Sequence, residues 1–262
     1  KKNILQDILK KILIIYDRSH NHNFSTFIFL NIFKKFSKNK IYYMHCNYTK
    51  EINFDLDLFD CVILFYSLRL PSLKYTKSFY KKITHFNGEK ILFSQDEQDF
   101  ANNLNLLIKK LKIDQVFTPV SKDKIRLIFK KQSHLVKYHS ILTSYIDDDF
   151  TLKNITQTHN RSIIISYRGR NEPLRYGSLG LDKALIGVNV RKFCKKNKIK
   201  SDIEIKNYKR IYWLKWYKFL SKSVAVLCSE TGCNLIDWNN DLSKKIDNIR
   251  NKSKNKNLSK SE

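Results

Sequence analysis

Proline and glycine are scarce in this sequence, with 3 and 6 residues among 262, so composition marks few breaks between elements. No apolar run reaches the length of a membrane span, and no signal-peptide pattern follows the first residue, which is Lys. The 5 cysteines show no CxxC spacing, which argues against zinc and favours reduced, mostly buried thiols. The 42% content of hydrophobic residues is nevertheless enough for packed cores, so the chain is not a disordered protein.

Acidic residues are also few, with 24 against 50 basic ones, and the formal net charge is +26. A charge of this size attracts polyanions and acidic membrane surfaces. The lysines, however, are spread over many segments together with abundant Asn and Ile, which is also typical of compositional drift with a solvated surface. Both interpretations stay open at this point.

Strand-like apolar runs alternate with helix-like runs over the first half of the chain, a pattern that predicts a parallel α/β sheet. The expected strands lie at 12–16, 41–44, 61–65, 90–94 and 115–118. The expected helices lie at 24–36, 72–86, 100–111 and 122–131. We therefore predict a doubly wound, Rossmann-like first domain over residues 1–145.

The alternation restarts after a polar transition that contains Asp147, Asp148 and Asp149. Strands are expected at 162–167, 201–205 and 223–227, and helices at 181–195 and 208–222. These elements predict a second Rossmann-like domain over residues 146–238, which is incomplete because three strands are about half of an open sheet. The Lys/Asn-rich residues 239–262 are predicted to be a poorly ordered tail, and we expect the chain to be a fragment.

Ligands of open α/β sheets bind beyond the carboxyl ends of the strands, which selects the loops 17–22, 95–98, 167–183 and 228–233. The third loop is the most informative, because Arg168 and Arg170 flank Gly169 and Lys183 lies near the start of the next helix. Arginine forks and a helix N-terminus suit the diphosphate of a nucleotide-activated sugar. Alternatively, the arginines tie the loop to carboxylates such as Glu172 and Asp182.

The other loops carry candidate carboxylates and a histidine. Asp96 and Glu97 follow Gln95 at a strand end, where one of them could orient an acceptor hydroxyl or accept its proton, or where both could cap the next helix. His20 lies after the first strand and offers an acceptor or phosphate contact, although a solvent-exposed position is equally compatible. No third ligand accompanies His20 and His22, so we expect no metal site.

Several short motifs appear in a fixed order along the chain. They are Ser166-Tyr-Arg-Gly-Arg170, Tyr176-Gly-Ser-Leu-Gly180, Asp182-Lys183 and Ser229-Glu-Thr-Gly232, preceded by Ile91-Leu-Phe-Ser-Gln-Asp-Glu97, Phe117-Thr-Pro-Val120 and Leu142-Thr-Ser-Tyr145. Together, from about residue 60 to 238, this series resembles the landmarks of a bacterial GT-B glycosyltransferase family, of the group 1 type, associated with surface polysaccharides.

The resemblance implies a two-domain GT-B enzyme of the retaining-type fold, with the acceptor on the first domain and a nucleotide sugar on the second. It implies that Arg170 and Lys183 bind the donor phosphates. It also implies that Glu230, with Thr231 and Gly232, lies near the donor sugar or ribose, where its carboxylate could accept hydrogen bonds from hydroxyls. No metal or other cofactor is expected.

Two departures from the family pattern are visible. Gln98 stands where an aromatic residue usually follows the carboxylates, and the sequence ends before a further helix that bears a glutamate. We therefore expect this chain alone to be weakly active or inactive.

The sequence thus predicts a cytoplasmic glycosyltransferase that moves a sugar onto a glycan or lipid-linked acceptor, with peripheral contact to an anionic membrane as a possible addition. The alternative is a basic nucleic-acid-binding α/β protein, which would need a basic groove lined with aromatic rings. A third interpretation is a flavodoxin-like module that acts by partner binding, suggested by Asp17 after the first strand.

Overall fold

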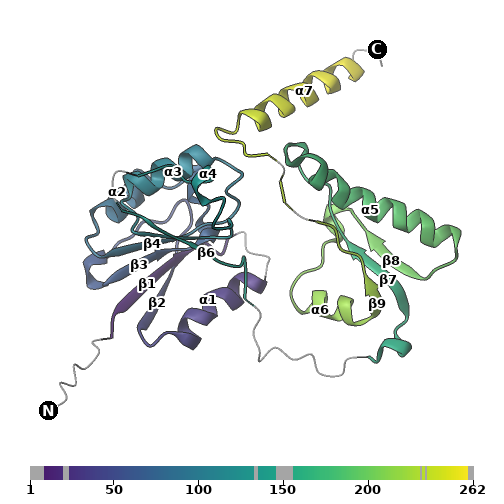
Figure 1. The fold of residues 1–262 in the computed structure, drawn as a ribbon, viewed down its shortest axis with the longest axis horizontal. Helices are drawn as coiled ribbons and strands as arrows, with labels where there is room; N and C mark the ends of the chain where they lie inside the picture. Colours follow the sequence, from purple (N-terminus) through teal and green to yellow (C-terminus); the bar gives the residue numbers. More distant parts are fainter. Residues whose placement is uncertain are drawn as a thin grey trace. The chain divides into compact units, whose positions relative to one another are not determined.

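The protein is described by a computed structural model that covers residues 9–19, 24–132, 135–145, 156–230, 232–233 and 235–258. The chain divides into two compact units, Lys1–Asp147 and Asp148–Glu262. Each unit contains its own parallel sheet, and each is described by itself below (Figure 1).

The first unit is built on a six-stranded sheet in the order β2-β1-β3-β4-β5-β6, with all neighbours parallel. The strands are β1 (Lys11–Tyr16), β2 (Lys40–His45), β3 (Cys61–Leu64), β4 (Glu89–Phe93), β5 (Gln115–Thr118) and β6 (Lys137–Ser140). The interior strands β1 and β3 are rich in buried Ile, Leu and Val, as expected for strands covered on both faces.

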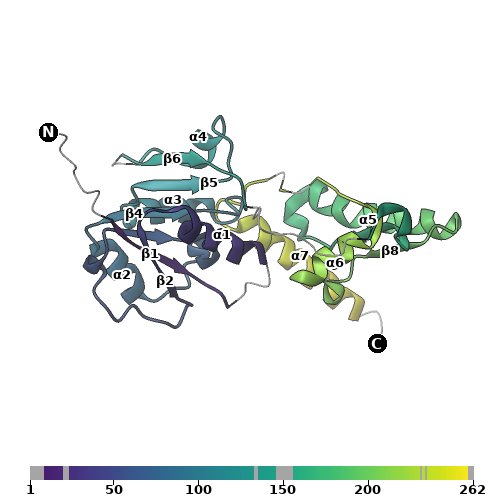
Figure 2. The same cartoon turned by 90° about the horizontal axis from the view of Figure 1, so that it is seen from below.

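Helices cover both faces of this sheet. Helix α1 (Phe24–Phe36) packs on one face, where Phe29 and Leu30 meet Ile14 and Ile63. Helices α2 (Lys77–His85) and α3 (Ala101–Lys110) pack on the other face, over the larger apolar core. In Figure 1, α1 lies below the sheet, and α2 and α3 lie above it. In the view from below, α1 is in front (Figure 2).

The order of the strands creates a switch point between β1 and β3. The chain leaves β1 towards β2 on one side and leaves β3 towards β4 on the other. Neighbouring crossovers that diverge in this way open a crevice at the carboxyl ends of the two strands, which is where ligands of such sheets bind. The order 2-1-3-4-5 is also the order of flavodoxin-like folds, here extended by β6.

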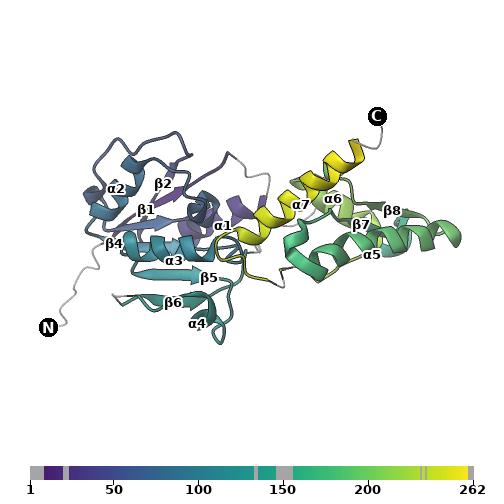
Figure 3. The same ribbon diagram turned by 90° about the horizontal axis from the view of Figure 1, so that it is seen from above.

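The second unit has a three-stranded parallel sheet in the order β8-β7-β9. Its strands are β7 (Ile163–Arg168), β8 (Ser201–Glu204) and β9 (Ser223–Val226). Helix α5 (Gly177–Lys196) runs along one face, as the view from above shows (Figure 3), and α6 (Leu214–Ser221) packs beside the edge strand β9. A small core of Tyr167, Cys194 and Ile203 joins α5 to the sheet.

The prediction of a parallel α/β architecture with two successive sheets is confirmed, but several elements differ from those expected. Strand β6 was not expected, since Lys137–Ser140 is polar, and it forms at the edge of the sheet beside β5. The helix expected at 122–131 is reduced to α4 (Ile125–Ile128). The buried Asn105 donates to Ile128 O and accepts from Lys130 N, which holds the chain extended there.

The last part of the chain also differs from expectation, because a helix, α7 (Asp241–Leu258), replaces the predicted poorly ordered tail. The buried Asp237 carboxylate accepts hydrogen bonds from Leu242 N at 3.2 Å and Ser243 N at 3.0 Å. These bonds satisfy two of the amide groups that the first turn of a helix leaves free, so they fix where α7 begins. Among the described residues, no helix is long and apolar enough to cross a membrane.

Candidate functional site

Two basic residues from separate elements meet at one carboxylate in the second unit. Arg170 Nε and Lys183 Nζ each lie 2.7 Å from Glu172 Oε1. Arg170 belongs to the loop that follows β7, the central strand, and Lys183 lies near the beginning of α5. The structure therefore places Arg170 and Lys183 together at the carboxyl edge of the sheet. Both pair with Glu172, the contact that the sequence offered for Arg170 as the alternative to phosphate binding.

Close packing of β7 against α5 positions this basic pair. A Cβ atom on Gly187 would lie 2.9 Å from the Tyr167 ring, and one on Gly169 would lie 2.5 Å from it. The ring therefore fits only because both neighbours are glycines, and its hydroxyl donates to Lys183 O over 2.5 Å. Gly169 was expected to let backbone approach a ligand, whereas here it makes room for Tyr167.

Burial and charge differ between the three members of the site. The Glu172 side chain is 5% exposed, whereas those of Arg170 and Lys183 are 39% and 27% exposed. Burial alone would raise the pKa of Glu172, but hydrogen bonds from Arg170 and Lys183 and their charges lower it overall. Glu172 Oε2 is buried and has no hydrogen-bond partner in the described part of the chain. Because two cations share one carboxylate, the site keeps an excess positive charge that faces solvent.

Arg168 was also expected to bind the donor, but its contacts are structural. Its guanidinium donates to Tyr167 O, Asp202 O and the Asp202 carboxylate, and it stacks 4.4 Å from the Phe219 ring centroid. These contacts tie β7 to β8 and α6 and leave the Arg168 side chain only 16% exposed. Arg168 therefore belongs to the framework of the unit and not to the basic pair.

The loop after β9 lies against the beginning of α5. Gly232 adopts φ +145°, and a Cβ added there would lie 3.8 Å from a methyl group of Leu179. Cys233 Sγ donates to Arg175 O over 3.5 Å. Glu230, in the same loop, is exposed. The predicted Thr231 lies outside the described residues.

The two carboxylates predicted in the first unit point in different directions, as expected for neighbours. Glu97 is 5% exposed and accepts a hydrogen bond from Thr118 Oγ1 over 2.6 Å. This side chain is therefore part of the core and not of an open site, and its burial raises the pKa of its carboxyl group. Asp96 adopts φ 63° and faces solvent, with its carboxylate 3.6 Å from Arg69 Nη2.

Gln95, the predicted acceptor-binding residue, lines a small pocket at the carboxyl edge of the first sheet. The walls are largely apolar, and residues that follow β3, β4, β5 and β6 all contribute to them. The lining consists of Phe29, Tyr66, Phe93, Ser94, Gln95, Pro119, Ile141, Leu142 and Thr143. The pocket has room for about one water molecule, so a ligand at this edge would contact the rim of the pocket and not enter it. The predicted His20 lies outside the described residues.

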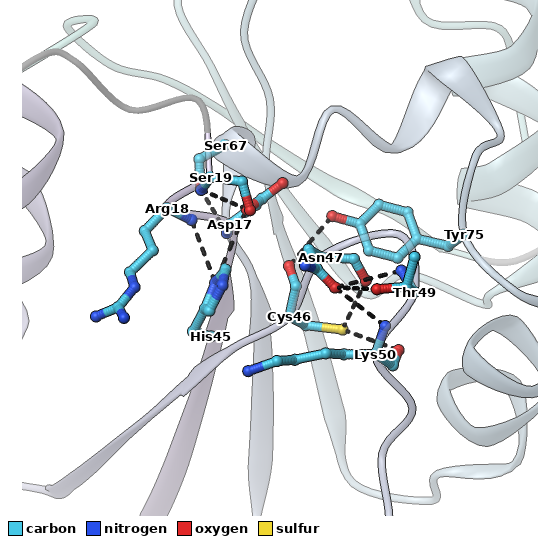
Figure 4. Close-up of polar contacts among 10 residues, drawn as sticks. All are labelled: Asp17, Arg18, Ser19, His45, Cys46, Asn47, Thr49, Lys50, Ser67 and Tyr75. Atoms are coloured by element: carbon cyan, nitrogen blue, oxygen red, sulfur yellow. Dashed lines mark hydrogen bonds and ion pairs between the residues drawn. The ribbon is translucent and has the colours of Figure 1, made fainter.

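A further polar cluster occupies the switch point of the first sheet (Figure 4). The buried Asp17 accepts from Ser19 N over 2.7 Å, and its own N–H donates to Ser67 Oγ after β3. His45, at the end of β2, has its Nδ1 3.8 Å from Asp17 Oδ1. The sequence pointed only to Asp17, because the juxtaposition of β1, β2 and β3 depends on a strand order that a sequence does not reveal.

The cysteines differ in burial: Cys228 is exposed and Cys233 is half-buried, whereas the other three are buried. Cys46, Cys61 and Cys194 are buried, and burial raises the pKa of Cys46 to about 11. A group of three or more His, Cys, Asp or Glu side chains able to hold a metal is not found in the described ranges. Comparison with protein-family models, curated proteins and solved structures finds no match.

Proposed function

We propose that the protein is a glycosyltransferase of GT-B type, in which the second unit binds a nucleotide sugar and the first unit binds the acceptor. The observation that carries this proposal is the convergence of Arg170 and Lys183 on Glu172 at the carboxyl edge of the second sheet. A leaving diphosphate develops negative charge, and two fixed cations in a partly buried site stabilise it as the bond to the sugar breaks.

Two features of the pair support a role beyond stability. Within the described residues, Arg170 uses only its Nε on Glu172, which leaves its two amino groups to bind phosphate oxygens. Glu172 Oε2, by contrast, is a buried acceptor without a donor, which is unfavourable for folding. Such costs are typical of residues kept for binding or catalysis.

The pocket lined by Gln95 supports the assignment of the acceptor to the first unit. It lies at the carboxyl edge of the sheet, and the half-buried Tyr66 ring and the Gln95 side chain at its rim could contact a glycan ring. Asp96, exposed nearby in sequence, is the carboxylate of the predicted pair able to reach a bound hydroxyl, whereas Glu97 is buried. In this proposal the acceptor is a glycan or lipid-linked sugar, and no metal takes part.

Nucleotide binding tests the proposal directly. Calorimetric titration with UDP, GDP, ADP, TDP and CMP should reveal one preferred nucleotide, and Arg170→Ala and Lys183→Ala should each abolish its binding. Arg191→Ala and Lys192→Ala are matched controls, because both residues are exposed on α5 away from the pair. The absence of binding for every nucleotide, or equal loss in the controls, would rule out the donor site.

A further inference from the structure

The segment that joins β8 to β9 has an unusual composition. Residues 206–222, called the aromatic–basic segment here, contain six aromatic and six basic residues and no acidic one. The aromatic residues are Tyr208, Tyr212, Trp213, Trp216, Tyr217 and Phe219, and the basic residues are Lys206, Lys209, Arg210, Lys215, Lys218 and Lys222. The sequence predicts one helix over residues 208–222, in which apolar side chains recur at helical spacing on one stripe. These side chains are Tyr208, Ile211, Tyr212, Trp216, Phe219 and Leu220.

The structure leaves two residues of this stripe exposed, Tyr208 at 73% and Tyr212 at 36%, and buries only Phe219 in α6. Trp213 and Leu214, outside the stripe, are 47% and 53% exposed. The expected helix divides into a short turn at Asn207–Lys209 and the eight-residue α6. Since large apolar side chains on a surface are costly, an exposed group of them marks a contact region.

The backbone conformation of Trp213 is a second, independent indication of a contact region. Trp213 adopts φ 59° and ψ −145°, a conformation that is strained for any residue with a side chain. This conformation interrupts the expected helix, so Trp213 caps α6 and Leu214 is its first residue, and both side chains are exposed. Strain of this kind persists where a side chain must be held in a required position.

The cations lie directly beside the exposed rings. Lys206 Nζ and Lys209 Nζ are 5.7 Å and 5.8 Å from the centroid of the Tyr208 ring. Arg210 Nη1 donates to the Tyr212 hydroxyl over 3.3 Å. All six basic residues of the segment are exposed. The surface therefore offers positive charge and apolar rings side by side, without a neighbouring acid in the segment.

We propose that the aromatic–basic segment docks the second unit onto an anionic lipid membrane. Lysine and arginine side chains bind lipid phosphates, while Trp and Tyr rings favour the boundary between headgroups and acyl chains. Leu214 distinguishes a membrane from a nucleic acid as the partner, because an aliphatic side chain gains from the acyl region but cannot stack on a base. The inference does not depend on the proposed enzymatic function.

Vesicle binding by the full chain tests this docking surface. Co-sedimentation is measured with vesicles of phosphatidylcholine alone and of phosphatidylcholine mixed with phosphatidylglycerol, and binding is expected only with the mixture. Lys209→Gln combined with Arg210→Gln should weaken partitioning by roughly 25-fold, or about fivefold for each cation removed. The matched control, Lys122→Gln with Lys192→Gln, makes the same charge change at exposed residues outside the segment and should have less than about a threefold effect.

The fluorescence of Trp213 tests whether the ring enters the membrane, which binding through charge alone would not cause. In a chain with Trp216→Phe and Trp238→Phe, Trp213 is the single tryptophan, and its emission should shift to the blue and be quenched by brominated lipids on vesicle binding. Absence of binding to the anionic vesicles, or equal losses in the two double variants, would overturn the proposal. Tighter binding to single-stranded RNA than to vesicles, lost in the same Lys209 and Arg210 variant, would also overturn it and favour a nucleic-acid partner.

Discussion

Thr118 and Glu97 form a buried hydrogen bond, in which Thr118 Oγ1 donates to Glu97 Oε1 over 2.6 Å. This bond joins the loop after β4 to the last residue of β5, directly beneath the exposed Asp96. It therefore holds in place the loop whose Gln95 lines the proposed acceptor pocket. In the proposed function, Glu97 therefore positions this loop and does not itself contact the acceptor.

The pKa of Glu97 is raised in the folded protein by burial, so its effect on stability has a defined sign. The stabilisation that it provides is complete below its unfolded pKa of about 4.3 and is lost as pH rises through the folded pKa. Glu97→Gln removes the charge and keeps an acceptor for Thr118. We expect the backbone amides of β4 and β5 to exchange hydrogen more slowly in this variant than in wild type at pH 7. At pH 4 the two proteins should exchange at the same rate. Lower protection at pH 7 would contradict this account.

Arg168→Lys should separate the framework role of Arg168 from donor binding. Lysine keeps the positive charge but cannot bridge Tyr167 O, Asp202 O and the Asp202 carboxylate while it stacks on Phe219. We expect a loss of about 2 kcal/mol in the free energy of unfolding of the second unit and a less than about twofold change in nucleotide affinity. Urea unfolding followed by tryptophan fluorescence measures the former, because all three tryptophans lie in this unit. A large loss of nucleotide affinity with unchanged stability would show instead that Arg168 binds the donor.

Glu172→Gln should lower the stability of the second unit in a pH-dependent way. Despite its burial, Glu172 has a lowered pKa because Arg170 and Lys183 donate to it, so its stabilisation is present above about pH 4.3 and is lost as pH falls through the folded pKa. We expect the variant to lose about 2 kcal/mol at pH 7 and to approach wild type below pH 4. Tryptophan fluorescence during urea unfolding at several pH values provides the measurement. A constant difference across the range would show that the ion pairs with Glu172 do not account for the loss.

Apolar periodicity predicted most of the strands and helices, because buried strands such as Cys61–Leu64 are continuous hydrophobic runs in the sequence. It failed where the deciding contact was tertiary. The edge strand Lys137–Ser140 is polar and forms by pairing with β5, and α4 is shortened by backbone bonds to the distant Asn105. The helix expected at 208–222 is interrupted at Trp213, whose backbone leaves helical geometry, and only Phe219 of α6 is buried.

The candidate sites divide in the same way. Arg170 and Lys183 could be predicted from the sequence because Arg170 follows a strand and Lys183 lies near the beginning of a helix. The partner that they share, Glu172, was proposed only as an alternative brace, and the structure shows it as the centre of the group. The cluster of Asp17, His45 and Ser67 required the order β2-β1-β3, which arises from crossover geometry and leaves no local signal.

The parallel pairing of every strand in both sheets also governs how the chain acquires its structure. Among the described strands no ladder is closed by a hairpin, because Lys11 pairs with Lys40, Cys61 with Glu89 and Gln115 with Lys137, each across an entire crossover. Such distant contacts make loop closure entropically expensive before any pairing is gained, so folding is slow compared with that of a helical bundle. During that delay the Ile- and Leu-rich strands are open to pairing with other chains, and the many like charges on the polypeptide oppose that association. The net charge of +26 thus disfavours association between chains before their sheets have formed.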